Sequence, residues 1–148
     1  MRPRSVLAVL SVLSVPTVLT AQAPPVQYIV PSGAPSTLPF SAAVRVGNLL
    51  YLSGMLGTDS TSKLVAGGVE AETRQALSNI KKTLESNGSD MDHVVKCLVM
   101  LADIGEWAKM NSVYVTFFPV HKPARSAFGA TGLALGGRLE IECIATVP

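Results

Sequence analysis

Apolar residues recur at helical spacing after position 68. Six side chains would share one face of a helix: Val69, Thr73, Ala76, Leu77, Ile80 and Leu84. Glutamates near the start and Lys81 and Lys82 near the end suit the helix dipole, and Asn87-Gly88 supplies a stop signal. The pattern therefore predicts a helix over residues 70–86.

A second helix is predicted between Asp103 and Pro119. Asp103, with Glu106 three residues later, is typical of a capping box, in which each side chain binds a free backbone N–H at the start of the helix. The expected apolar stripe of this helix consists of Ile104, Trp107, Tyr114, Phe117 and Phe118.

The remaining apolar runs predict strands over residues 44–46, 49–52, 94–101, 124–130 and 139–147. Gly47-Asn48 separates the first two runs and is a two-residue hairpin signal. The third run is apolar enough to be buried on both faces of a sheet. A Gly136-Gly137 turn separates the last two.

This order of elements predicts an α+β fold, in which two helices cover one face of a mixed β-sheet. Helices on one face only would leave the other face bare. Because an exposed apolar sheet face needs a partner, we expect the chain to form an oligomer.

The N-terminal segment has the layout of a secretory signal peptide. Arg2 and Arg4 precede an apolar run over residues 6–19, and small residues flank Gln22 at a cleavage site. The apolar run is too short to span a membrane and contains Pro16. We therefore expect export, with no membrane attachment after cleavage. The predicted parts are a signal peptide over residues 1–23, an extended arm over residues 24–37 and a domain over residues 38–148.

Charge and ligand chemistry exclude several classes of function. The 148 residues include 12 basic and 10 acidic side chains, but two of the basic ones lie in the predicted signal peptide. The mature chain then has ten of each and no basic patch, so we expect no nucleic-acid partner. His93 and His121 stand alone and no C-x-x-C motif occurs. We expect neither a metal site nor a cofactor.

The two cysteines, Cys97 and Cys143, each lie inside an apolar run. Export would permit a disulfide between them. A buried free thiol is the commoner state for such cysteines. The sequence leaves both states open, because it does not show whether the two strands are neighbours.

One cation in a strand-like run is a candidate for function. Arg125 lies in the apolar stretch ARSAFGA, where an unpaired charge is costly. Its planar guanidinium is suited to binding a carboxylate, and Glu140 could orient or activate a water molecule. The alternative is that Arg125 forms a structural ion pair with Glu140 or Glu142, and physical chemistry alone favours that pair.

Four segments in order resemble the RidA/YjgF family of imine deaminases, over residues 38–147. The segments are LPFSAAVRVGNLLYLSG, TRQALSNIKKTLESNGSDMDHVVKCLVML, DIGEWAKMNSVYVTFFP and PARSAFGATGLALGGRLEIECIA. The last contains the P-A-R-S and E-I-E motifs typical of the family. The resemblance implies a chorismate-mutase-like fold and a homotrimer with three clefts between subunits.

The resemblance also implies a reaction and its residues. Members of the family hydrolyse small 2-imino or 2-enamino acids to 2-keto acids and ammonia. Arg125 would bind the substrate carboxylate and Glu140 would position the attacking water. The other residues implied to line the cleft are Asn111, Ser53, Gly54, Phe40 and Ala127.

Four departures from the family pattern imply a divergent branch with altered substrate preference. Phe40 replaces a common Tyr and so lacks a hydroxyl, Ala127 replaces Cys, Met55 replaces Gln, and Thr131-Gly132 breaks the signature. A non-catalytic trimer that binds small carboxylates is the alternative function. Ribonuclease or chaperone-like behaviour is a third, and the balanced charge of the mature chain disfavours RNA binding.

Overall fold

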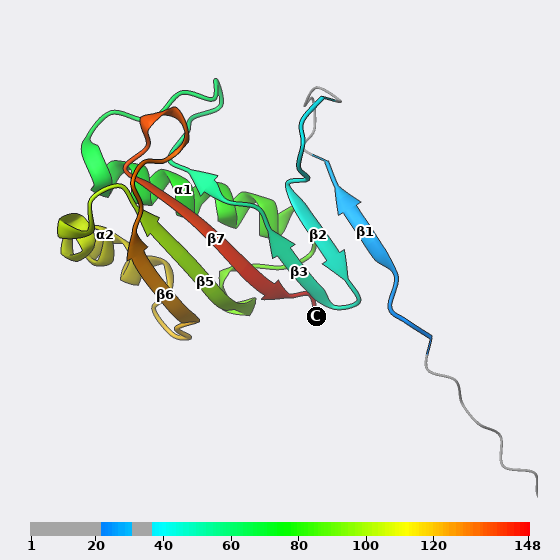
Figure 1. Cartoon of the computed structure of the whole chain (residues 1–148). Coiled ribbons are helices and arrows are strands. Elements are labelled where there is room, and N and C mark those ends of the chain that lie inside the picture. Colours follow the sequence, from blue (N-terminus) through cyan, green and yellow to red (C-terminus); the bar gives the residue numbers. More distant parts are fainter. Residues whose placement is uncertain (1–21, 31–36) are drawn as a thin grey trace, which may run out of the picture.

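Within residues 22–30 and 37–148, the part that the computed structural model describes, the chain forms one sheet and a helical layer (Figure 1). The strands are β1 (Val26–Ile29), β2 (Ala43–Val46), β3 (Leu49–Leu52), β4 (Met55–Leu56), β5 (Val94–Leu101), β6 (Ala124–Gly129) and β7 (Leu139–Thr146). The α-helices are α1 (Gly68–Glu85) and α2 (Trp107–Tyr114). Short 3₁₀ turns are η1 (Met91–His93), η2 (Ile104–Glu106), η3 (Val115–Phe117) and η4 (Ala134–Gly136).

The sheet is mixed, as predicted. Its strand order is β1-β2-β3-β7-β5-β6, and the short β4 also pairs with β7. Only β5 and β6 are parallel; the other described pairs are antiparallel. The predicted hairpin is confirmed, since Val46 pairs with Leu49 across Gly47, which has a left-handed φ of 60°. The last strand of the chain therefore lies in the middle of the sheet.

Helix α1 confirms the predicted helix with a start two residues earlier. All six residues of its predicted stripe are at most 3% exposed. Gly88 has a φ of 76°, and the Ser89 N–H donates to the Leu84 carbonyl at 3.0 Å, which satisfies one of the last carbonyls of the helix. The apolar stripe packs on the sheet, mainly against β7 and β4.

The second predicted helix is divided into η2, α2 and η3. Asp103 caps η2 by accepting the Gly105 N–H at 2.8 Å, but Glu106 does not complete a capping box. Its Oε2 instead accepts from Arg138 Nε at 2.6 Å. The predicted apolar stripe was partly wrong: Ile104 and Trp107 are 52% and 41% exposed, because α2 turns Met110 and Val113 toward the core instead.

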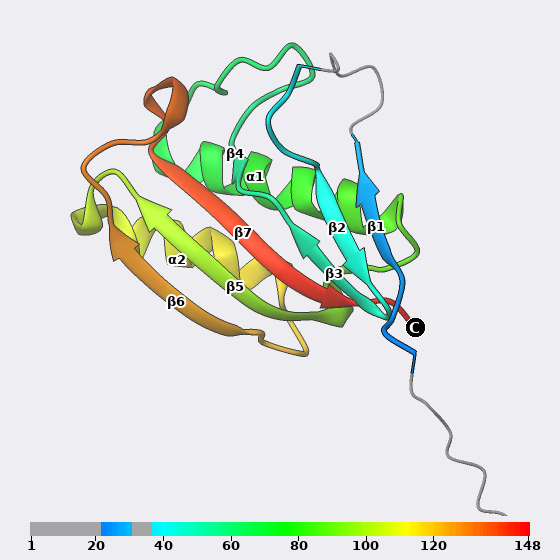
Figure 2. The same ribbon diagram turned by 45° about the vertical axis from the view of Figure 1, so that its right-hand side comes forward.

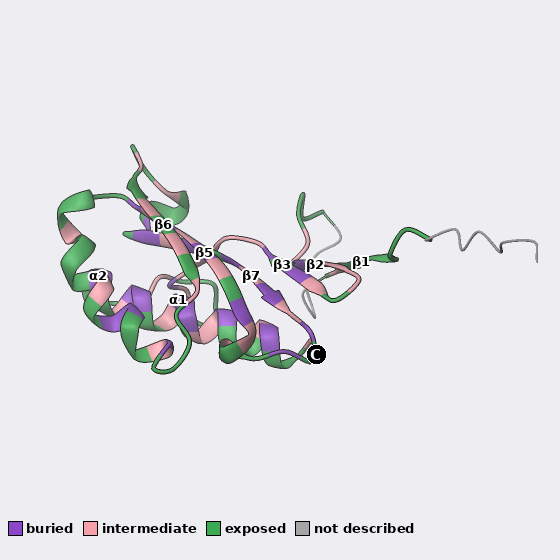
Figure 3. Ribbon diagram, turned by 90° about the horizontal axis from the view of Figure 1, so that it is seen from below, coloured by how far each residue is buried: buried purple, intermediate pink, exposed green. Residues whose placement is uncertain are grey.

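Both α-helices lie on one side of the sheet, and the other side is bare (Figures 2 and 3). The prediction that residues 94–101 are buried on both faces was therefore wrong within one chain. Burial alternates along β5, with Cys97, Val99 and Leu101 fully buried beneath the helices. The bare face contains cross-strand rows of largely apolar side chains. One row runs through Tyr28, Val44, Tyr51, Ile144, Lys96 and Ala124.

A disulfide joins Cys97 of β5 to Cys143 of β7. The two residues are direct partners in the antiparallel ladder, with Cα atoms 4.1 Å apart, and both face the helices. Of the two states that the sequence left open, the structure has the disulfide and not a buried free thiol. The sequence could not decide between them, because the pairing depends on the register of two strands whose cysteines are 46 residues apart.

The predicted arm includes an edge strand, because β1 pairs with β2 along four residues. The predicted signal peptide lies almost entirely outside the described residues, which begin at position 22. Among the described residues, no helix has both the length and the apolar character needed to cross a membrane.

Candidate functional site

Arg125 lies on the helix-covered side of the edge strand β6. In the parallel ladder it is the partner of Cys97, which faces the core, so its side chain points toward α2. Its Cζ lies 4.5 Å from the ring centroid of Tyr114 and 5.6 Å from that of Trp107. Both distances are typical of cation–π contacts, which orient the guanidinium without neutralising it. We call Arg125 with these two rings the arginine cradle.

The cradle contains no counter-charge. In the described part of the chain no carboxylate lies within ion-pair distance of Arg125. A cavity of about 300 Å³ opens beside it, and Asn111 lines this cavity from the same face of α2. An unpaired, half-buried guanidinium beside a cavity is suited to binding an anion from outside the chain.

Tyr114 contributes its ring to the cradle and remains neutral. The residue is 5% exposed, and its hydroxyl is buried without a hydrogen-bond partner among the described residues. Burial raises the pKa of Tyr114 to about 12, although the charge of Arg125 acts in the opposite direction. The phenol is therefore protonated at all physiological pH values.

Glu140 lies on the bare side of the sheet. It is three residues from Cys143 along β7 and pairs with Met100 of β5 and Leu56 of β4, so it points away from the helices. Its carboxylate covers Gly54, where a Cβ would lie 2.7 Å from Glu140 Cδ and would overlap Oε1. Glycine is required at position 54 for this close approach.

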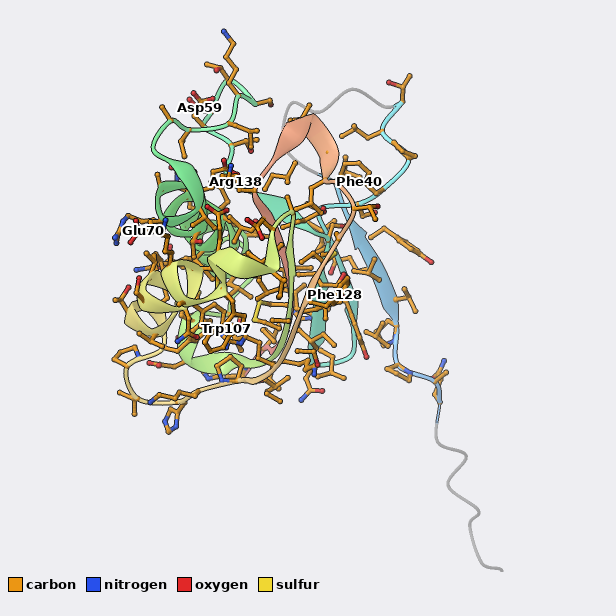
Figure 4. All side chains as sticks on the ribbon, turned by 60° about the vertical axis from the view of Figure 1, so that its left-hand side comes forward. Phe40, Asp59, Glu70, Trp107, Phe128 and Arg138 are labelled. Carbon is orange, nitrogen blue, oxygen red and sulfur yellow. A yellow bond between two sulfur atoms is a disulfide. The ribbon has the colours of Figure 1, made fainter. Side chains whose placement is uncertain are left out.

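The alternative interpretation, a structural ion pair between Arg125 and Glu140 or Glu142, is therefore wrong within one chain. Alternation along β7 puts both glutamates on the bare face, whereas Arg125 lies on the covered face. The sheet itself separates the two charges. Figure 4 shows the two sides: Trp107 lies with α2 on one side, and Phe128, in the same cross-strand row as Glu140, lies on the other.

Some of the other expected cleft residues lie near Arg125, and the rest lie near Glu140. Asn111 lines the cavity beside Arg125, and Ala127, two residues further along β6, packs against the core. Ser53 precedes Gly54 and its hydroxyl donates to the Ser41 carbonyl at 2.6 Å. This bond holds the segment that carries Phe40, which is 56% exposed. The expected cleft residues thus form an arginine group on the covered side and a glutamate group on the bare side, and the two groups do not meet within one chain.

Sequence reasoning missed a polar network around Arg138. The Arg138 N–H donates to Glu72 Oε2 at 2.8 Å, and its guanidinium pairs with Glu106, which raises the pKa of Arg138. The network ties Arg138, the residue before β7, to Glu72 of α1 and to Glu106 of η2. Sequence reasoning also missed the cradle, although Trp107, Asn111 and Tyr114 have the i, i+4, i+7 spacing of one helix face. In the described part of the chain, no three His, Cys, Asp or Glu side chains gather as metal ligands would.

Comparison with known proteins gives consistent matches. The sequence model described as Endoribonuclease L-PSP matches residues 32–147. The bovine 2-iminobutanoate/2-iminopropanoate deaminase is 46% identical over 114 residues, which cover 76% of this chain and 83% of that protein. The Arabidopsis thaliana chloroplastic Reactive Intermediate Deaminase A is 42% identical over 116 residues, which cover 77% of this chain and 62% of that protein.

Solved structures agree with these sequence matches. The crystal structure of yeast YEO7 has a TM-score of 0.78 and 38% identity, and the match covers 84% of this chain and all of that one. The E. coli YjgF gene product has a TM-score of 0.75 and 31% identity, over 82% of this chain and 99% of that one. Identity of this level over nearly the whole domain, together with the shared fold, shows that the chain belongs to the RidA/YjgF family.

Proposed function

We propose that this chain is an enzyme that hydrolyses small 2-imino and 2-enamino acids to 2-keto acids and ammonia. The observation that carries the proposal is the pair of separated, unneutralised charges. Arg125 is oriented by two aromatic rings beside a cavity, and Glu140 covers Gly54 with no ion-pair partner among the described residues. The bovine relative is named for 2-iminobutanoate and 2-iminopropanoate, the substrate class that this pair of charges suits.

The two halves of the site require a second copy of the chain. Because the sheet separates Arg125 from Glu140, one chain cannot present both to one small substrate. The bare face, with its apolar rows, is suited to covering by another copy. In our proposal the protein is a homotrimer, and each cleft combines Arg125 of one copy with Glu140 of its neighbour.

The chemistry needs only these two charged groups. The Arg125 fork anchors the substrate carboxylate, and Glu140 accepts a proton from water as the water oxygen attacks the imine carbon. The imine reacts in its protonated form, so this attack gives a neutral carbinolamine. Glu140 then returns the proton to the nitrogen and the C–N bond breaks as the C=O bond forms. Ammonia leaves, and the free carboxylate of Glu140 takes the proton of the hydroxyl group. One water is consumed for each imine, and the electrophilic carbon needs no covalent nucleophile.

The proposal is tested on the purified mature chain with freshly generated 2-iminopropanoate and 2-iminobutanoate. Loss of the imine should be faster than in buffer, with equal amounts of keto acid and ammonia released. The alternative, a non-catalytic trimer, would bind 2-oxobutanoate but leave the rate of imine loss unchanged. That result would overturn the enzymatic proposal.

An RNA substrate is disfavoured, despite the description that the matching family model bears. Residues 24–148 contain ten basic and ten acidic side chains, whereas binding to phosphates needs a surplus of clustered cations. A small carboxylate needs only one well-placed guanidinium.

We also propose that the protein is exported and that its mature chain begins at Pro24. The sequence of residues 1–23 supports this, and so does the Cys97–Cys143 disulfide, since such bonds persist mainly in oxidising compartments. N-terminal sequencing of the secreted or periplasmic fraction should give Pro24 first. An intact Met1 on a cytosolic protein would contradict the proposal.

A further inference from the structure

The cavity beside Arg125 has a second cation on its wall. Its lining consists of Asn111, Tyr114, Val115, Phe118, Lys122, Pro123 and Arg125. None of these residues is acidic. In the described part of the chain, neither Lys122 nor Arg125 has a carboxylate within ion-pair distance or a side-chain hydrogen bond to another residue.

Another cavity of the same chain shows how unusual this lining is. A cavity of about 540 Å³ beside α1 also has two cations, Arg74 and Lys81. Three acidic residues line it as well: Glu85, Asp90 and Asp92. Lys81 pairs with Glu85 at 3.8 Å. The acidic residues thus outnumber the cations there, whereas the cavity beside Arg125 has two cations and no acidic residue.

The floor of this cavity strengthens its attraction for anions. Phe118 is 1% exposed and Tyr114 is 5% exposed, so closely packed aromatic rings form part of the wall, and charges beside such a wall interact more strongly than in open water. Two like charges that share such a space repel each other. A ligand with two negative charges relieves this repulsion and satisfies both cations at once. Arg125 offers a planar fork to one carboxylate, and Lys122 offers a mobile point charge to the other.

We propose that the cavity makes Lys122 a specificity-determining residue, which selects dicarboxylic 2-imino acids over monocarboxylic ones. This inference rests on the proposed function, because Arg125 is taken to bind the carboxylate next to the imine carbon. Lys122 then binds the distal carboxylate.

Binding of keto-acid product analogues tests the inference apart from turnover. Trp107 is the only tryptophan of the chain and lies in the arginine cradle, so its fluorescence should report ligands at Arg125. Calorimetry gives an independent dissociation constant. Wild type should bind 2-oxoglutarate about tenfold or more tightly than 2-oxobutanoate, because charge-assisted hydrogen bonds are the strong ones.

Lys122→Met keeps the length of the side chain but removes its charge. It should weaken 2-oxoglutarate binding about tenfold and leave 2-oxobutanoate binding nearly unchanged. Lys109→Met is the matched control, since Lys109 is an exposed lysine of α2 that does not line the cavity. The imines of glutamate and of 2-aminobutanoate should show the same ranking in kcat/KM.

The outcomes separate this inference from the proposed function. Tighter binding of the dicarboxylate that depends on Lys122 supports the inference even if no imine is hydrolysed, a result that overturns only the proposed reaction. Equal binding of both keto acids, or a preference that survives Lys122→Met, overturns the inference even where hydrolysis is fast.

Discussion

Charged residues on the two faces of the sheet have different surroundings. On the covered face, Arg125 lies against aromatic rings of α2, in a setting that the same chain supplies completely. On the bare face, Glu140 lies between Leu56 and Met100 in a row that ends at Phe128, with no helix above it. In the proposed trimer, the covered face supplies the complete anchoring half of the site, and the bare face supplies a half that a second chain must cover.

This difference explains how opposite charges remain available. A guanidinium and a carboxylate on the same face would pair and neutralise each other. Placed on opposite faces, they cannot meet within one chain, whatever rotamers they adopt. In the proposed trimer, a substrate in a cleft between copies then meets an anchoring cation and a free carboxylate.

The largest effect is expected from Glu140→Gln, which keeps the shape of the side chain but removes its charge. Turnover should fall about a hundredfold or more, because water activation is lost, while binding of 2-oxobutanoate survives. Glu142→Gln, on the same strand and face, is the matched control and should retain activity. Melting temperature is measured beside turnover. A Glu140→Gln protein that melts early, or one that keeps full activity, would end the catalytic assignment.

Mixing two inactive variants tests whether the halves come from different copies. Arg125→Ala and Glu140→Gln chains, co-expressed in equal amounts, should regain about a quarter of the wild-type activity, since random assembly leaves one cleft in four intact. A chain with both substitutions, mixed with either single variant, is the control and should restore nothing. No recovery in the first mixture would show that both residues act from one chain.

Gly54→Ala should lower turnover by an intermediate amount, and it should change the structure only on the bare face. The added Cβ overlaps the carboxylate of Glu140, a flexible group that can move aside, so the fold should survive. Displacing the carboxylate should lower turnover about tenfold or more. Gly132→Ala is the control, because no atom lies within 4 Å of a Cβ there. A Gly54→Ala protein with wild-type turnover would mean that the position of Glu140 is unimportant.

The smallest effect is expected from Tyr114→Phe on the covered face. The ring that orients Arg125 remains, and a buried hydroxyl without a partner is removed, so stability at neutral pH should be unchanged or slightly higher. The wild type should lose stability as the pH rises from about 10 to 12, because the unfolded tyrosine ionises before the folded one.

The Tyr114→Phe variant should not show the part of the stability loss at alkaline pH that comes from ionisation of Tyr114. Thermal melts of both proteins between pH 8 and 12 measure the difference, and Tyr51→Phe, at a residue that is 42% exposed, is the control. If Tyr114→Phe lowered the melting temperature at neutral pH, the hydroxyl would have a partner after all.

The sequence predicted those parts of the fold that depend on local spacing. The stripe of α1 was correct in every residue, and so was the turn at Gly47-Asn48, because the residues that decide them are neighbours in the chain. The mixed sheet with helices on one face followed from the order of the elements. For the site, the sequence supplied the residue types, and the resemblance supplied their pairing.

The rest depends on register between distant strands. Whether Cys97 meets Cys143, and whether Arg125 shares a face with Glu140, depends on which residue of one strand lies opposite which residue of another. A shift of one residue reverses every face. Trp107 was assigned to the core because an aromatic residue at helical spacing has the same pattern whether it packs inward or against a cation. Spacing alone does not distinguish these two roles.

The central position of the last strand has a consequence for how the protein is made. β7 lies between β3 and β5, yet it is synthesised after the other described strands. Until it emerges, the β2–β3 hairpin and the β5–β6 pair have no strand between them, and Cys97 has no partner. A nascent chain therefore cannot complete the sheet or form the Cys97–Cys143 bond before β7 has left the ribosome.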